Sequence, residues 1–428
     1  MTGPADNPAG GAAGSLATGQ RSLADPSLLF PLLPVLTEGC PRSSTAEMQY
    51  PLEIDYDYGR VDRRLFDQAP LPGLARWAPL LPPLVPGLDL GEGGTALLPA
   101  HDLGRALGFT GELFLKDESR NPTWSHKDRL NLCTVSAAQL SGAPGIAVAS
   151  SGNHGAAAAA FAARIGLPCV VVTSEGPQPS FRRFLAALGA HVVLTGPDDR
   201  WPVLRRIVEA TGFMPASNLT RFHTGNPYGP EGYKTIAYEL FLQLDRRVPD
   251  IVLVPTGYAE LLFGLFKGFR ELRLLGLADR LPRLMSAEPA ARGPLARAVG
   301  SNAAAVEVPA APSAAAGIAC TVGGYRGVVA LKESGGAALT CSEAALAGMQ
   351  ARLAHRGLYQ EISGAAGLAA GAEAVAGGTV LDGLVVAILT STGLKDGPME
   401  VSDVPVHTAA TVDSLIAQLR AAAGAGER

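Results

Sequence analysis

A lysine in the stretch NPTWSHKDR is the first candidate for chemistry in this sequence. Lys127 stands between His126 and Asp128, just after a proline-containing turn, in a chain in which only 17% of residues are charged. A lysine is costly to bury, and one confined in apolar surroundings usually has a neutral, chemically engaged amine. Lys127 is therefore either an ordinary surface charge or the amine that holds a cofactor.

A second polar loop, SSGNHG, follows the predicted strand GIAVA and precedes a predicted helix. Its hydroxyls, backbone N–H groups and helix start could hold a carboxylate, because helix N-termini bind anions. The alternative is a turn that only caps the helix, which is the commoner use of such residues. The loop consists of Ser150, Ser151, Gly152, Asn153 and His154, followed by a glycine.

Two further loops follow predicted strands. In PTGYAEL, Gly257 and the next N–H groups could cradle a phosphate at a helix start, although Glu260 would repel a phosphate if its side chain pointed inward. The alternative is a tight turn with Glu260 near the positive end of the helix dipole. In LTSTGLKD, Thr390 could offer a neutral hydroxyl to a ring nitrogen, yet threonine is also ordinary at a strand end.

The elements that must position these loops alternate along the chain. From about residue 145, short apolar runs (GIAVAS, CVVVTS, HVVLTG) alternate with amphipathic ones, and a second series adds DIVLVPTG, RLMSAEP and GLVVAILTSTG. Runs of this kind predict strands separated by helices, hence βαβ units and parallel sheets. We therefore expect an α/β enzyme with two lobes and doubly wound sheets, which bind ligands at the carboxyl ends of strands.

Composition narrows the range of partners. The formal net charge is −4 and the arginines form no block, which argues against nucleic-acid binding and favours a small-molecule substrate. The five cysteines form no C-x-x-C pair, so a zinc ribbon or disulfide framework is not expected, and a reducing cytoplasm fits. The run SLLFPLLPVL is too short and proline-broken to cross a bilayer, and the start of the chain lacks the basic residues of a signal peptide.

The four loops together resemble the threonine synthase group of pyridoxal-phosphate enzymes, which have the tryptophan-synthase-β-like fold (fold type II). The resemblance also includes PLEIDYDY, LGEGGTALLPA and NPYGPEGYKTIAYEL, in the family's order from about residue 51 to 396. It implies pyridoxal 5′-phosphate as cofactor and an amino acid as substrate. It further implies a large cofactor-binding domain of residues 39–130 and 236–428, a smaller mobile α/β domain of residues 131–235, and a flexible tail of residues 1–38.

The resemblance also assigns roles to individual residues. Lys127 matches the lysine that forms the internal aldimine and, once an amino acid displaces it, acts as general base for the α-proton. The SSGNHG loop matches the grip on the substrate carboxylate, with Asn153 also near the ring hydroxyl of the cofactor. Thr390 matches the partner of the pyridine nitrogen, where a hydroxyl favours elimination or replacement at Cβ or Cγ. The cofactor phosphate loop would be Gly257, Tyr258, Ala259 and Glu260.

Several residues depart from the family pattern. Trp124 and His126 replace Gly and Phe; we expect Trp124 to fill space, and His126 is either a proton shuttle at the substrate or, the interpretation we favour, a packed histidine bonded to backbone. Gly229 stands where threonine synthases commonly carry an arginine for the substrate phosphate, a charge-assisted contact of about 1.5 to 3 kcal/mol. Tyr258 and Glu260 replace the usual Asn and Gly of the phosphate loop.

Three hypotheses follow. The first is a lyase or replacement enzyme whose substrate differs from that of threonine synthase. The second is a true threonine synthase that converts O-phosphohomoserine to threonine. The third is a catalytically silent protein that binds pyridoxal phosphate, while a dehydrogenase is disfavoured because no G-x-G-x-x-G follows the first strand. A homodimer is the default expectation for a soluble enzyme.

Overall fold

The computed structural model describes residues 14–69, 71–150, 152–174, 179–196, 199–396, 410 and 412–425. The chain divides into two compact units, residues 1–395 and 396–428. The second unit contains the helix α13 (Val412–Ala425). All the predicted site residues lie in the first unit.

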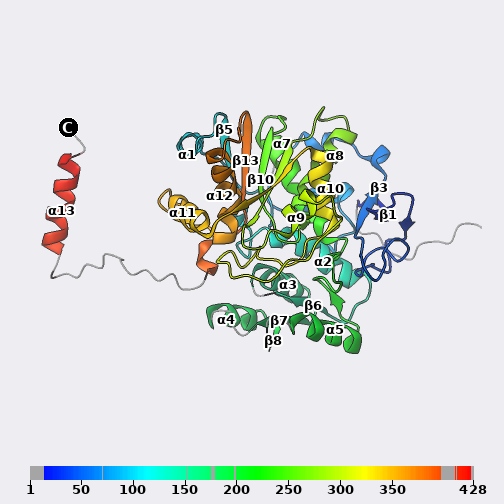
Figure 1. Ribbon diagram of the computed structural model, residues 1–428. Helices are drawn as coiled ribbons and strands as arrows, with labels where there is room; N and C mark the ends of the chain where they lie inside the picture. The colour runs from blue at the N-terminus through cyan, green and yellow to red at the C-terminus, as the bar shows by residue number, and fades with distance from the viewer. Residues whose placement is uncertain are drawn as a thin grey trace, which may run out of the picture. The chain divides into compact units, whose positions relative to one another are not determined.

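The larger sheet of the first unit has the strand order β12-β11-β10-β13-β5-β4 (Figure 1). All neighbouring strands pair parallel except β4 with β5. The strands are β4 (Leu97–Pro99), β5 (Glu112–Asp117), β10 (Ile251–Pro255), β11 (Arg283–Pro289), β12 (Ala337–Cys341) and β13 (Leu384–Leu389).

Helices cover both faces of this sheet, because its strands are apolar on both sides. Along β10, Val252 and Val254 join one hydrophobic core, and Ile251 and Leu253 join the other. This is the alternation that a strand buried on both faces requires. The first core also contains side chains of α8 (Glu260–Leu274) and α10 (Tyr325–Ser334), and the second those of α11 (Glu343–Ala354) and α12 (Ile362–Ala376).

The smaller sheet has the order β8-β7-β6-β9 and is parallel throughout. It confirms the strands and helices predicted between residues 145 and 212, and the two sheets together confirm the two-lobed α/β fold. Its elements are β6 (Ile146–Ala149), α3 (Asn153–Arg164), β7 (Cys169–Ser174), α4 (Pro179–Ala187), β8 (His191–Thr195), α5 (Arg200–Thr211) and β9 (Met214–Pro215).

A third, antiparallel sheet has the order β2-β1-β3. Its strands are β1 (Ala17–Ser22), β2 (Leu29–Phe30) and β3 (Leu52–Tyr56), so part of the range 1–38, expected as a flexible tail, is ordered here. The buried Gln20 side chain donates hydrogen bonds to the carbonyls of Pro31 (2.7 Å) and Pro34 (2.9 Å). These contacts fix a segment whose sequence, ATGQRS, lacks the apolar alternation of a typical strand.

The helix α2 (Lys127–Leu140) lies against α6 (Gly229–Tyr233). A Cβ at Gly232 would lie 1.9 Å from the carbonyl oxygen of Arg129, so only glycine permits this approach. The segment EGYKTIAYELFLQL, expected as one helix, divides into α6 and α7 (Thr235–Gln243). The remaining elements are α1 (His101–Ala106), α9 (Pro294–Gly300) and the 3-10 helices η1 (Tyr58–Arg60), η2 (Arg63–Phe66), η3 (Leu74–Leu80), η4 (Glu118–Arg120) and η5 (Gly393–Lys395).

Two searches of the described residues found nothing. No helix there combines the length and apolar character that a membrane span needs. No group of three or more His, Cys, Asp or Glu side chains there could hold a metal ion.

Candidate active site

Lys127 is the first residue of α2, and its amine lies in a largely buried environment. Burial lowers the pKa of Lys127, although the charge of Glu260 opposes this shift. The Nζ atom lies 4.0 Å from Oε2 of Glu260 and 5.5 Å from the centre of the Tyr233 ring. Lys127 is therefore not an ordinary surface charge.

The loop PTGYAEL connects the end of β10 to the start of α8. Ala259 has a left-handed backbone (φ 64°) and is the N-cap of α8. No described residue accepts a hydrogen bond from the backbone N–H of Gly257, Tyr258 or Ala259. This helix start can therefore donate to an anion, while the Glu260 carboxylate points inward toward Lys127.

The loop SSGNHG ends at the start of α3. No described residue accepts a hydrogen bond from the N–H groups of Asn153, His154 or Gly155, as expected for the first turn of a helix. Ser150 caps the turn, because its Oγ accepts from the N–H of Gly152 at 3.2 Å. Ser151, predicted to belong to the substrate loop, lies outside the described residues.

The side-chain amide of Asn153 joins the smaller sheet to loops of the larger one. Its Nδ2 donates to Oε2 of Glu361 (2.7 Å), and its Oδ1 accepts from Oγ of Ser391 (3.0 Å) and Nζ of Lys395 (2.6 Å). Burial lowers the pKa of Lys395 to about 8, although Glu361 and Asp128 oppose the shift. Sequence patterns assigned no role to Glu361, Ser391 or Lys395; the only signal was the place of two of them in LTSTGLKD.

Thr390 follows β13 and is bonded to the lysine loop. Its carbonyl oxygen accepts from the N–H of His126 (3.0 Å) and lies 3.1 Å from the ring Nδ1 of the same residue. The His126 ring also stacks on Tyr233, with 5.3 Å between ring centres. Burial, then the charge of Lys127, holds the pKa of His126 well below its usual value. These contacts match the favoured interpretation of His126 as a packed histidine.

Trp124 does not fill space in the core, and that expectation was wrong. Its side chain is 49% exposed and lies 5.6 Å, between ring centres, from Phe184 of α4. Its backbone has φ 60°, a conformation that suits the glycine of the family pattern better than a tryptophan. Trp124 also lines a cavity of about 330 Å³, together with Gln360, Thr392 and other residues.

Around Lys127 several buried polar atoms have no partner among the described residues. They are Nε2 of His154, Nδ1 of His223 and the hydroxyl of Tyr233. Burial and the charge of Lys127 lower the pKa of His154 to about 3, so its imidazole is neutral at physiological pH. We call Lys127, His154, His223, Tyr233 and Glu260 the Lys127 cluster; sequence patterns did not indicate His223 or Tyr233.

Comparisons with known proteins agree with this arrangement. Residues 88–391 match the family model "Pyridoxal-phosphate dependent enzyme". The chain belongs to this family. It is 32% identical over 377 residues to a threonine synthase of Methanosarcina acetivorans, which covers 85% of this chain and 91% of that protein. It is 33% identical over 326 residues to a threonine synthase of Mycobacterium tuberculosis, covering 75% and 87% of the two chains.

Solved structures of related enzymes share the fold. A bacterial threonine deaminase, from T.th., superposes with a TM-score of 0.58 at 27% identity, covering 71% of this chain and 94% of that one. An O-ureido-L-serine synthase gives a TM-score of 0.61 at 23% identity, covering 78% and 100%. At this identity the second likeness is one of fold alone.

The residues present fit pyridoxal phosphate. The N–H groups at the start of α8 can take its phosphate, Lys127 can take its aldehyde, and Asn153 and Thr390 offer polar groups for its ring. The orphaned atoms of the Lys127 cluster are also as expected of a site built for a ligand. Glu260 alone does not favour an added anion.

Proposed function

We propose that this pyridoxal-phosphate-dependent enzyme catalyses elimination or replacement at the β or γ carbon of an L-amino acid, and that Lys127 holds the cofactor and moves the α-proton. The observation that carries the proposal is the buried amine of Lys127, whose pKa burial lowers. A general base needs a substantial neutral fraction near working pH, and this shift increases that fraction. Pyridoxal phosphate supplies the electron sink for the carbanion that forms at Cα.

The neighbouring residues serve binding and orientation in this proposal. The N–H groups of Asn153, His154 and Gly155, which no described residue engages, receive the substrate carboxylate at the start of α3. The bonds from Asn153 to the larger sheet keep that helix start in place. Thr390, beside the packed His126, faces the cofactor ring with a neutral hydroxyl.

A true threonine synthase is the second candidate, supported by identities of 30–33% over most of the chain. Against it stands Gly229, where the resemblance would place an arginine for the substrate phosphate. A Cβ at Gly229 would lie 2.9 Å from Cγ of Leu130, so α2 already fills the space where such a side chain would begin. We therefore favour a substrate without that phosphate.

A catalytically silent cofactor-binding protein is the third candidate, and the inward-pointing Glu260 is the observation in its favour. One set of experiments separates the three. Borohydride reduction of the cofactor-loaded protein, followed by peptide mass mapping, should place the label on Lys127. Phosphate release from O-phosphohomoserine would then be assayed beside ammonia and 2-oxo acid release from serine, threonine and phosphoserine.

Label on another lysine would refute the assignment of Lys127. Rapid phosphate release with threonine formation would establish the threonine synthase. A cofactor absorption band that responds to no amino acid would establish the silent protein.

A further inference from the structure

The carboxylate of Glu260 is fixed inside the candidate site. It starts α8, is 8% exposed, and lies 4.0 Å from the amine of Lys127. A Cβ at Gly225 would lie 2.7 Å from Oε1 of Glu260 and 2.8 Å from Cε1 of His223, so these two side chains converge on the same point. Glycine at position 225 (φ 58°) leaves room for both.

Two buried polar atoms beside this carboxylate have no described partner. They are Nδ1 of His223, a residue only 4% exposed, and the hydroxyl of the fully buried Tyr233. The Tyr233 ring lies 5.5 Å from Nζ of Lys127, on which Glu260 also converges. Buried polar groups are nearly always hydrogen-bonded, so these atoms indicate a place for a polar ligand group.

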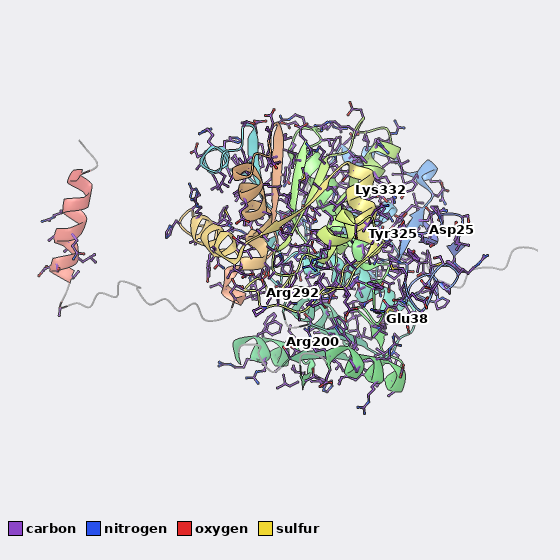
Figure 2. The ribbon with its side chains drawn as sticks, in the orientation of Figure 1. Asp25, Glu38, Arg200, Arg292, Tyr325 and Lys332 are labelled. Atoms are coloured by element: carbon purple, nitrogen blue, oxygen red, sulfur yellow. The ribbon has the colours of Figure 1, made fainter. Side chains whose placement is uncertain are left out.

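The cations near Glu260 are already engaged. Arg326 is buried, and its two Nη atoms donate to the carbonyls of Thr224 and Leu52. Arg292 and Arg200, labelled in Figure 2, come from the loop after β11 and from the start of α5. Arg292 donates to the carbonyls of Ala311 and Ala319, so its guanidinium too is held by backbone.

We propose that Glu260, Tyr233 and His223 form the subsite for the side-chain end of the substrate, and that it takes a hydrogen-bond-donating group, a hydroxyl or a protonated amine, in preference to a phosphate ester. The carboxylate accepts hydrogen bonds only, while the phenol and the imidazole supply a donor and a further polar nitrogen. A phosphate a few ångströms from Glu260 would meet a like charge in partly dry surroundings, which weakens binding by about tenfold or more. This inference rests on the proposed function, whose substrate class it names.

Matched ligand pairs test the inference on the full-length, cofactor-loaded protein. Dissociation constants for L-homoserine and O-phospho-L-homoserine, and for L-serine and O-phospho-L-serine, are measured from the shift of the cofactor absorption band and by calorimetry. The protein should bind the unphosphorylated member of each pair at least about tenfold more tightly. Glu260→Gln should shift this ratio toward the phosphorylated member by a similar factor.

Two further variants make the outcome specific. Glu333→Gln removes the same charge from an exposed site on α10 and should leave the ratio unchanged. Tyr233→Phe removes only the hydroxyl and should weaken binding of L-homoserine and L-serine; this variant also serves if Glu260→Gln does not fold. An unchanged affinity in Tyr233→Phe would overturn the subsite.

Three results would overturn the inference. They are tighter binding of the phosphorylated ligands, a ratio that Glu260→Gln leaves unchanged, or an equal loss for both ligands, which would make Glu260 only a counterion of Lys127. Failure of the proposed function is distinguishable, because then no amino acid would shift the band or borohydride would not label Lys127. A shifting band with an unchanged ratio refutes the subsite alone.

Discussion

Replacement of Arg129 by methionine tests how the start of α2, and with it Lys127, is fixed. Arg129 is fully buried; its Nε and Nη2 donate to Glu118 at 2.7 and 2.9 Å, and its Nη1 and Nη2 donate to Glu239 at 2.5 and 2.8 Å. In Arg129→Met, Glu239 keeps its ion pair with Lys116 (2.7 Å), whereas Glu118 loses both bonds to a cation.

The expected loss follows from the charge left behind. Removing one partner of a buried ion pair costs about 3 to 5 kcal/mol, because the other charge stays buried and uncompensated. We therefore expect Arg129→Met to lower the free energy of unfolding by about that amount. Urea denaturation followed by circular dichroism measures it, and the variant should also retain less cofactor because Lys127 is two residues away on the same helix.

Two controls separate charge from packing. Arg246→Met breaks an exposed ion pair with Asp67 (2.7 Å) and should cost less than about 1 kcal/mol. The double variant Arg129→Met, Glu118→Gln removes the stranded charge and should recover much of the lost stability. A double variant no more stable than Arg129→Met would refute the reasoning and leave lost packing as the cause.

Three further predictions concern single positions. Burial raises the pKa of Glu288 to about 7, so the folded state loses stability as pH rises from about 4.5 to 7, by roughly 3 kcal/mol, and Glu288→Gln should abolish this slope in urea titrations at several pH values. Gly232→Ala would place a Cβ 1.9 Å from the Arg129 carbonyl oxygen and should cost about 3 kcal/mol or more, while Gly300→Ala, with nothing within 4 Å, should be nearly neutral in the same denaturation assay. At Trp124, with φ 60°, the glycine variant should melt higher than the alanine variant by the equivalent of about 1 kcal/mol, because both lose the contact with Phe184 and only alanine keeps the strain.

The elements best predicted from the sequence are those whose apolar pattern is complete within a few residues. The strands β6, β7 and β8 are short apolar runs between glycine-closed helices, and their local pattern already determines both type and boundary. The helix α12 escaped prediction because its sequence, ISGAAGLAAGAEAVA, has little polar face. Its small residues have a tertiary cause: a Cβ at Gly367 would lie 3.1 Å from the carbonyl of Leu253 in β10, so the helix packs unusually close to the sheet.

The candidate site was predictable only where a loop follows a strand. Lys127, Asn153, Glu260 and Thr390 each stand in such a loop, and the order of these loops along the chain made the resemblance specific. His223 could not be found this way, because the chain around it has no regular pattern and its position depends on long-range packing. The direction of a side chain is equally a tertiary property, so the sequence left open whether Glu260 points inward.

The two sheets contribute different chemistry to one place, and this explains the polar bonds at their junction. The start of α3 comes from the smaller sheet, whereas Lys127 and the start of α8 belong to elements packed on the larger one. A carboxylate grip that moved freely relative to Lys127 could not hold an α-proton within reach of the amine. The amide of Asn153, held by Glu361 and Lys395, limits that movement in the absence of substrate. The same amide is expected at the cofactor ring, so cofactor binding and the alignment of the two sheets should depend on each other.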